Sequence, residues 1–379
     1  MRLGLQLGYW GAGPPAGAAE LVVAAERAGF EAVFAAESWG SDAFTPLAWW
    51  GSRTSRVLLG TSVAQLSART PTSCAMHALT LDHLSGGRAV LGLGVSGPQV
   101  VEGWYGGPFG KPLARTREYV SIIRQVLARE APVRGDGPHY PLPYAGPGAV
   151  GLGKPLRPIT HPLRADLPIW LGAEGPKNVA LAGEIADGWL AIYYSPRLGP
   201  TYAEWLAEGM ARPGARRTRG EFTVAASCAV LVTDDAAGEI ARLKHSMALY
   251  LGGMGAPGQN FHADVFSRMG YAEAVTEIGA LFLAGRREEA AAAVPDELVA
   301  DTAIIGTAQQ VRAGMAAWQA AGVDMLVVGC RDAAQLEALA AAAAPTPSGS
   351  LPASETRSSF ESGSEASAGP AAARTGAAS

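Results

Sequence analysis

The sequence predicts an α/β protein, and most economically a closed (β/α)8 TIM barrel. Strand-like and helix-like segments alternate from the first residues onward, and eight such pairs can be counted along the chain. The strand-like segments are nearly continuous apolar runs, which is typical of parallel strands covered on both faces. The chain has 379 residues, 48% of them hydrophobic, which suffices for the core of such a barrel. A doubly wound sheet is the alternative, but it usually has fewer strands.

The first half of the chain supplies four of the eight units. Its first helix shows an apolar face, because Leu21, Val22, Ala25 and Ala28 recur at helical spacing. We predict strands and helices alternately at Leu3–Leu7, Ala16–Ala28, Ala32–Ala36, Ala43–Arg53, Val57–Val63, Thr72–Leu84, Ala89–Leu93 and Arg115–Arg129.

The second half supplies the other four units and carries two long insertions. We predict the next strands and helices alternately at Pro168–Leu171, Lys177–Ile185, Trp189–Tyr193, Tyr202–Met210, Phe222–Val232 and Ala236–Tyr250. The last unit follows with a helix, a strand and a helix at Ala308–Ala321, Met325–Val328 and Asp332–Ala343.

The insertions are long enough to suggest lids or interface elements. Gly135–Ala165, between strands four and five, is rich in Pro and Gly, and we expect a loop over the barrel mouth. Leu251–Asp301, before the last unit, contains helical pieces of its own. The end of the chain, Pro345–Ser379, has few large apolar residues, so we expect a barrel domain at 1–344 and a disordered tail at 345–379.

Composition excludes several classes of protein. The net charge is −4, which gives no sign of a nucleic-acid partner. Because no apolar run reaches membrane-spanning length and the first residues already read as a strand, we expect a cytoplasmic protein without a membrane partner. Three widely spaced cysteines, Cys74, Cys228 and Cys330, are expected as reduced thiols. Without a His/Cys cluster or an HExxH motif, we expect no metal site.

Two glycine-rich motifs are chance matches. The pattern Gly92-x-Gly94-x-x-Gly97 resembles a dinucleotide fingerprint, but no helix opens at once and the pattern lies in the fourth unit rather than the first. Gly148-x-x-x-x-Gly153-Lys154 resembles a phosphate-binding P-loop, but Pro155 replaces the Ser or Thr that would contact magnesium.

Glycines and polar side chains gather where the predicted strands end, which in barrels is the ligand-binding face. Gly94 and Gly97 follow the fourth strand and leave room for a planar or phosphorylated ligand. After the fifth strand, Gly172 to Lys177 opens a helix with Pro176 in its first turn. Its free amides, with Lys177 nearby, predict a phosphate site, although a plain turn with a solvated lysine is the alternative.

Other groups at the same ends are candidates for contact with substrate. The sequence Glu37-Ser38-Trp39 follows the second strand, and Thr61-Ser62 ends the third. Aromatic residues that could line the mouth are Trp10, Trp39, Tyr140 and Tyr193, although loop aromatics also pack structurally. Any of His139, His161 and His262, which lie in the insertions, could touch substrate. A basic run, Arg212 to Arg219, is either a solvated loop or an anchor for an acidic ligand tail.

Several segments together resemble a known family. These are Thr80–Gly94 (TLDHLSGGRAVLGLG), Gly29–Val33, Gly60–Val63, Gly172–Lys177 and Ala186–Trp189 (ADGW), in this order. The chain resembles the bacterial-luciferase-like flavin oxidoreductases over about residues 1 to 340, and within them the actinobacterial branch that uses the deazaflavin coenzyme F420 instead of FMN.

The resemblance implies a place for the coenzyme. Its ring would lie in the mouth, supported by a bulge at Ser62-Val63 that is often a non-prolyl cis peptide in this family. The ring's polar edge would meet the backbone of Thr61 to Val63 and of Val95, Ser96 and Gly97. Its phosphate would meet the loop residues Ala173, Glu174, Gly175, Pro176 and Lys177.

One departure leaves the acid/base group open. Many deazaflavin-dependent relatives carry an Asp-His pair after the second strand, where this chain has Glu37-Ser38. Since a serine is not a general base at neutral pH without help, that role falls to Glu37, to Ser38 with assistance, or to a group from an insertion.

The function implied is hydride transfer between F420 and a small organic substrate. The alternatives are an FMN-dependent monooxygenase that uses molecular oxygen, and a non-catalytic flavin-binding protein. The resemblance also implies a homodimer, for which the helices at Ala43–Arg53 and Thr72–Leu84 could supply the contact.

Overall fold

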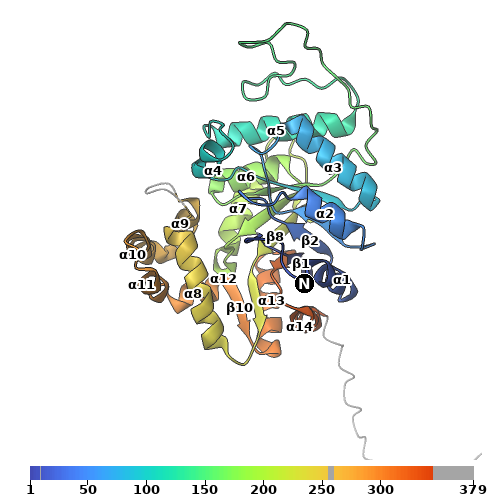
Figure 1. Cartoon of the computed structure of the whole chain (residues 1–379). Helices are drawn as coiled ribbons and strands as arrows, with labels where there is room; N and C mark the ends of the chain where they lie inside the picture. The colour runs from blue at the N-terminus through green and yellow to red at the C-terminus, as the bar shows by residue number, and fades with distance from the viewer. Residues whose placement is uncertain (9, 255–259, 345–379) are drawn as a thin grey trace, which may run out of the picture. The chain divides into compact units, whose positions relative to one another are not determined.

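The computed structural model describes residues 1–8, 10–254 and 260–344, and these form a closed parallel barrel with helices outside it (Figure 1). The predicted tail at 345–379 lies outside the described residues. No helix within the described ranges is long and apolar enough to span a membrane.

Eight strand positions close the barrel, which confirms the predicted (β/α)8 architecture. Every ladder is parallel, and the last strand returns to pair with the first, Arg2 opposite Met325. At the third position the strand is interrupted, and both of its halves pair with the fourth. The barrel strands are β1 (Arg2–Gln6), β2 (Ala32–Ala35), β3 (Leu58–Thr61) with β4 (Ala64–Gln65), β5 (Ala89–Gly94), β6 (Ile169–Gly172), β7 (Gly188–Ile192), β8 (Thr223–Ser227) and β11 (Met325–Val328).

The outer helices lie close to their predicted ranges, except that a short helix, α4, opens directly after Gly97, where no helix was predicted. Capping explains where several begin: Thr70 accepts a hydrogen bond from the Ser73 N–H before α3, and Thr307 forms a capping box with Gln310 before α13. The outer helices are α1 (Ala18–Arg27), α2 (Phe44–Gly51), α3 (Pro71–Ser85), α4 (Pro98–Gly103), α5 (Pro112–Ala128), α6 (Pro176–Ile185), α7 (Gly199–Met210), α13 (Ala308–Ala320) and α14 (Ala333–Ala343).

The predicted seventh strand, Phe222–Val232, is two strands in the structure. β8 belongs to the barrel, whereas β9 (Ala229–Val232) leaves it and pairs in parallel with β10 (Ala303–Gly306), a strand that the sequence analysis did not predict. The apolar run continues through Cys228 without Gly or Pro, so nothing in it marks the break.

Large and small residues alternate inside the barrel. Phe34 and Trp170 fill much of the interior, with ring centroids 6.0 Å apart. A Cβ on Gly60 would lie 2.4 Å from Phe34 Cε1, and one on Gly188 would lie 2.7 Å from Trp170 Cδ1. These glycines are therefore needed for close packing around the two rings.

The charged residues of the LDHLSGGR segment stabilise the amino-terminal end of the barrel. Arg88 donates to the carbonyls of Ser85, Gly51, Thr54 and Val57. Its guanidinium thus joins the turn before β5 to the end of α2 and the start of β3.

The first insertion does not cover the mouth, so that prediction is wrong. His83 Nε2 lies 2.8 Å from the His161 carbonyl oxygen, and Arg164 donates to Asp82 and to the Ala89 carbonyl at the start of β5. In Figure 1 the loop extends outward beyond α5. A helix-to-strand connection begins and ends at the amino-terminal face of a barrel, whereas ligand-binding loops follow the strands.

The second insertion follows β9 and has its own hydrophobic core, which includes Phe266, Ile278 and Leu298. The predicted helix at Ala236–Tyr250 and the predicted helical pieces after it are confirmed. The elements are α8 (Ala236–Gly252), α9 (Phe261–Phe266), η3 (Ser267–Tyr271), α10 (Ala272–Leu283), α11 (Arg287–Ala292) and α12 (Asp296–Thr302).

Candidate functional site

The strand interruption between β3 and β4 forms one wall of the candidate site. The Ser62–Val63 peptide bond is cis, as the resemblance implies. The Ser62 N–H donates to the Ala35 carbonyl (2.8 Å), and Gln6 Nε2 donates to the Ser62 carbonyl (3.3 Å). The bulge is therefore held from β1 and β2 at the carboxyl-terminal end of the barrel.

Thr61 joins β3 to β5 through its side chain. Its Oγ1 donates to the Gly92 carbonyl (2.6 Å) and accepts from the Gly92 N–H (2.9 Å). The Thr61 side chain is buried, and its hydroxyl both donates and accepts a hydrogen bond within the protein. The hydroxyl is therefore not free to bind a ligand in the mouth.

Val63 lies over the ends of β5 and β6, where two glycines make room for it. A Cβ on Gly94 would lie 2.4 Å from Val63 Cγ2, and one on Gly172 would lie 3.1 Å from Val63 Cγ1. The glycine that follows the fourth strand thus accommodates the bulge directly.

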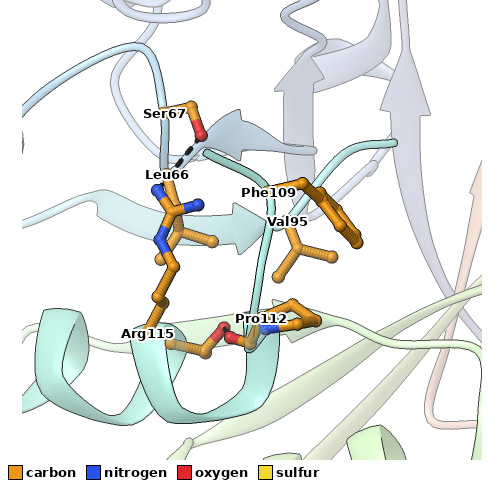
Figure 2. A pocket seen from close by; sticks show the side chains of 7 residues that line it. Leu66, Ser67, Val95, Phe109, Pro112 and Arg115 are labelled. Carbon is orange, nitrogen blue, oxygen red and sulfur yellow. Dashed lines mark hydrogen bonds between the residues drawn. The ribbon is translucent and has the colours of Figure 1, made fainter. Parts of the chain in front are cut away.

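The segment after β5 borders a small pocket (Figure 2). Ser96 adopts a left-handed conformation (φ 58°), and Gly97 is the N-cap of α4. Arg115 reaches from α5 to Ser67 Oγ (3.4 Å) and to the Tyr140 hydroxyl (3.2 Å). The pocket is lined by Leu66, Ser67, Val95, Phe109, Pro112, Arg115 and Thr116.

Glu37 is buried and fully paired. Its carboxylate forms an ion pair with Arg69 (2.7 Å) and accepts from the Gln65 N–H (2.9 Å). Ser38 lies beside it, and its carbonyl accepts from the Tyr105 hydroxyl (3.4 Å), whose pKa is raised by burial and by Glu37. This arrangement suits a structural ion pair at the end of β2 better than a free base.

The four predicted substrate aromatics do not form one cluster. Trp39 is 54% exposed on the loop after β2, and Trp10 is half-buried after β1. Tyr140 packs edge-on against Tyr119 of α5, with centroids 5.4 Å apart. Tyr193, in a left-handed conformation after β7, packs 4.6 Å from the Phe266 ring of the second insertion.

The loop between β6 and α6 has the geometry of an anion site. Gly175 is the N-cap of α6 and has no side chain to cover the first amides. Trp189 Nε1 donates to the Ala173 carbonyl (2.8 Å) and so positions the loop. Lys177 is exposed in the first turn and forms no ion pair with any described residue.

The second insertion contacts this loop through Glu174. His262 Nδ1 lies 3.0 Å from Glu174 Oε1, and Arg268 donates to the Glu174 carbonyl (3.0 Å). The adjacent residue of the insertion, Phe261, stacks on Phe109, with ring centroids 6.1 Å apart. Nothing in the sequence distinguishes His262 from His139 and His161, because the path of the insertion back to the mouth has no local sequence signal.

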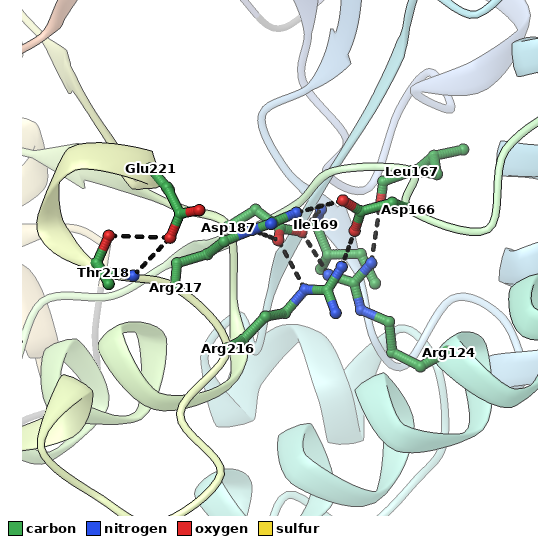
Figure 3. A network of polar contacts seen from close by, with 9 residues as sticks. All are labelled: Arg124, Asp166, Leu167, Ile169, Asp187, Arg216, Arg217, Thr218 and Glu221. Atoms are coloured by element: carbon green, nitrogen blue, oxygen red, sulfur yellow. Dashed lines mark hydrogen bonds and ion pairs between the residues drawn. The ribbon is translucent and has the colours of Figure 1, made fainter.

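The basic run lies at the opposite end of the barrel, so it is not an anchor for a ligand tail at the mouth. Arg216 and Arg217 each donate through Nε to Asp187 Oδ1 (2.7 Å both), just before β7 begins, and both reach Asp166 (Figure 3). Arg212 is paired with Glu184. Charged side chains up to 51 positions apart in the sequence are thus neutralised at the amino-terminal end.

The described ranges contain no group of three His, Cys, Asp or Glu side chains that could hold a metal ion. All three cysteines are free thiols.

The chain is similar in sequence to a known family and to named proteins. Residues 4–325 match the family described as luciferase-like monooxygenase. A Mycobacterium tuberculosis protein named "Putative coenzyme F420-dependent oxidoreductase Rv3520c" is 67% identical over 341 residues, which cover 90% of this chain and 98% of that protein. The 5,10-methylenetetrahydromethanopterin reductase of Archaeoglobus fulgidus is 31% identical over 282 residues, covering 73% and 78% of the two chains.

Solved structures share the fold. The coenzyme F420-dependent tetrahydromethanopterin reductase of Methanopyrus kandleri superposes with a TM-score of 0.74 at 24% identity, over 89% of this chain and 97% of that one. An F420-dependent secondary alcohol dehydrogenase superposes with a TM-score of 0.68 at 16% identity, over 90% and 97%.

Proposed function

Because the chain belongs to the luciferase-like monooxygenase family, we propose that it is a coenzyme F420-dependent oxidoreductase that transfers a hydride to or from a small organic substrate. The observation that carries this proposal is the 67% identity to Rv3520c across 98% of that protein. FMN with molecular oxygen is the alternative chemistry, since the same fold serves monooxygenases.

The residues at the mouth fit a phosphorylated, planar coenzyme. The uncapped amides at Gly175 and the unpaired Lys177 would hold the phosphate, and Val63 would support the ring. Gln6 Oε1 and Gln65 Oε1, at the ends of β1 and β4, are buried acceptors without a hydrogen-bond partner among the described residues, and they suit ring N–H donors. When bound, the deazaflavin supplies the site that accepts or donates the hydride.

The chain's own contribution is orientation and exclusion of water. Trp189 holds the phosphate loop through the Ala173 carbonyl, and the contact of Phe109 with Phe261 covers one side of the mouth. A covered mouth strengthens the electrostatic interactions within it.

A binding titration tests the coenzyme. We expect the protein to bind F420 more tightly than FMN, followed by quenching of tryptophan fluorescence. Removing the charge with K177Q is expected to weaken F420 binding about 5- to 10-fold at low salt and less at high salt, whereas K154Q on the outer loop leaves it unchanged. Tighter binding of FMN than F420, or of neither, would contradict the proposal.

A substrate can be identified by measuring which compounds cause the protein to oxidise reduced F420. A panel of carbonyl, imine and activated alkene acceptors is added, and the coenzyme absorbance is followed with and without oxygen. Turnover that requires an organic acceptor supports hydride transfer, while turnover that requires only FMN and oxygen supports the monooxygenase. Binding of F420 without turnover throughout the panel supports the non-catalytic alternative.

We also propose a homodimer joined through α2 and α3. These helices expose Trp49 (59%) and Met76 (61%), large apolar side chains that a partner would cover. Light scattering after size exclusion is expected to give twice the chain mass, and the double variant W49E/M76E to give a monomer. A monomeric wild type would contradict this contact.

The remaining proposals concern location and extent. Free thiols at Cys74, Cys228 and Cys330 suit the reducing cytoplasm, which cell fractionation can test. A chain truncated after Ala344 is expected to bind F420 as tightly as the full chain, because residues 1–344 form one compact unit.

A further inference from the structure

The second insertion brings one titratable side chain to the mouth. His262 lies near the start of α9, and its ring contacts Tyr193, which follows β7 (5.8 Å, 79°), and Tyr250 at the end of α8 (5.2 Å, 72°). These edge-on contacts orient the imidazole. The same ring faces Glu174, which follows β6, so His262 lies above two neighbouring strand ends.

The two nitrogens of this imidazole have different surroundings. Nδ1 is buried and lies 3.0 Å from Glu174 Oε1, within ion-pair distance, but it forms no aligned hydrogen bond with any described residue. Nε2 points away from that carboxylate, and the ion pair of this side chain is formed through Nδ1 alone within the described residues. The side chain keeps 22% of its exposure, and since Nδ1 is buried, the exposed part lies on the rest of the side chain, which includes the Nε2 edge of the ring. A carboxylate on one nitrogen with the other nitrogen open is the arrangement of a histidine general acid or base.

Glu174 has a second feature that points to this role. Its Oε2 is buried and has no hydrogen-bond partner among the described residues, so this oxygen of the carboxylate is left unsatisfied by them. Arg268 holds its backbone carbonyl from the same insertion. The carboxylate is thus held in place beside the imidazole by contacts from the loop and from the insertion.

The other candidates are less suitable. Glu37 has Arg69 on its carboxylate together with the Gln65 N–H. Ser38 has no base beside it among the contacts that the described residues make. Of these three candidates, His262 is the one that has a carboxylate beside one ring nitrogen and a second ring nitrogen that forms no ion pair among the described residues. It lies at the carboxyl-terminal end of the barrel, where the mouth is.

We propose that Glu174 and His262 form the proton-transfer pair of this oxidoreductase, and that its substrate carries a carbon–oxygen or carbon–nitrogen bond at the reacting centre. The inference rests on the proposed function. In the reducing direction the substrate carbon accepts a hydride from the reduced coenzyme, which is thereby oxidised by two electrons. The heteroatom takes the Nε2 proton, so the π bond breaks, C–H and heteroatom–H bonds form, and solvent reprotonates the imidazole.

The first test locates His262 relative to the coenzyme. Full-length protein is treated with diethylpyrocarbonate with and without saturating F420, and each histidine is quantified by mass spectrometry. We expect bound F420 to slow modification of His262 at least about 10-fold and that of His245 less than about 2-fold. His245 is the matched control, because its Nε2 pairs with Glu288 (3.0 Å) on the insertion's outer surface.

The outcomes separate the two proposals. If wild-type protein does not bind F420, the proposed function is wrong. If F420 binds and His262 reacts as fast as before, the proposed function stands and the proton-transfer pair is overturned. Nitrogen-15 NMR adds a readout without coenzyme: we expect the neutral ring to carry its proton on Nδ1 in the wild type and to lose this preference in E174L. An unchanged tautomer would overturn the pairing.

The kinetic test uses an acceptor from the panel described above. H262Q is expected to bind F420 within about 2-fold of the wild type and to lose about 100-fold in kcat, and added imidazole is expected to restore part of the loss in H262A. E174Q is expected to lose less than H262Q, since it removes only the orienting charge. Full kcat in H262Q would overturn the proposal.

Discussion

Replacing Asp187 with Asn removes the charge at the centre of the amino-terminal network. Asp187 is 6% exposed, and its carboxylate accepts from Arg124, from Arg216 and Arg217, and from the Ile169 N–H (2.8 Å). Asn has nearly the same shape, but its amide group would present N–H donors to guanidinium donors. Breaking a buried ion pair from one side typically costs about 3–5 kcal/mol, because charges remain buried without a partner.

The expected loss of free energy of unfolding corresponds to a fall in the melting temperature Tm. An unfolding entropy of about 2.1 cal/mol/K per residue gives the compact unit Met1–Ala344 about 0.7 kcal/mol/K, so D187N should lower Tm by about 4–7 °C. Differential scanning calorimetry of both proteins measures this shift. D166N is the matched control: Asp166 also pairs with Arg216 and Arg217 but is 59% exposed, and we expect less than about 1 kcal/mol.

The effect of D187N should also depend on pH in a definite direction. Burial would raise the pKa of Asp187, but Arg124, the Ile169 N–H and Arg216 outweigh it and hold the pKa below its usual value. A lowered folded pKa contributes stability that is complete above the unfolded value of about 3.9 and is lost as pH falls through the folded pKa. The Tm difference between wild type and D187N should therefore be constant near neutrality and shrink in acid.

Two results would refute this reasoning. A loss below about 1 kcal/mol for D187N would mean that the arginines find other partners or water once the charge is gone. Equal losses in D187N and D166N would mean that burial does not set the size of the effect.

Two further predictions concern the carboxyl-terminal end. T61V keeps the side-chain shape but leaves the Gly92 N–H and carbonyl without their partner, so we expect calorimetry to show a loss of about 2–4 kcal/mol in the free energy of unfolding. A loss below about 0.5 kcal/mol would contradict the bridging role. G94A would place a Cβ 2.4 Å from Val63 Cγ2, so we expect weaker F420 binding in titration and a loss of about 1–3 kcal/mol in the free energy of unfolding. The control is G103A, because a Cβ at Gly103 would enter open space.

Much of the barrel could be predicted because its signal is local. Each strand is an apolar run and each helix has an apolar face, so periodicity alone locates them within a few residues. The break at Cys228 could not be predicted, because β9 leaves the barrel only when β10 is there to pair with it. That partner lies more than seventy residues away, and its sequence, Ala303–Gly306, is too short to be distinctive.

The parts of the candidate site that lie at strand ends could be predicted from the order of the strands. Gly94 ends a barrel strand, Val63 and Gly175 follow barrel strands, and closure of the sheet brings strand ends together regardless of the loops. Contacts that depend on the course of a long insertion were not predictable. The approach of His262 to Glu174 is one, since the two residues are 88 positions apart and no short motif relates them.

Charge patterns were the least informative local signal. A run of arginines suggests a ligand for an acidic group only if nothing in the fold neutralises it. Here Asp187 and Asp166 neutralise Arg216 and Arg217, and both acids flank β6 and β7 at the end of the barrel away from the mouth. Whether an arginine in this run is free to bind an acidic ligand therefore depends on which acidic side chains the fold places beside it.

The two ends of this barrel divide stability from chemistry. At the amino-terminal end, Arg88 and Asp187 bond to backbone groups that begin strands, so their loss should cost stability without changing coenzyme affinity in the folded fraction. At the carboxyl-terminal end, Lys177 has no ion-pair partner and Glu174 keeps an unsatisfied oxygen among the described residues, so their loss should cost binding or turnover and little stability. Because unsatisfied buried groups are destabilising, the buried oxygens of Gln6, Gln65 and Glu174 at this end are groups that a bound ligand would satisfy.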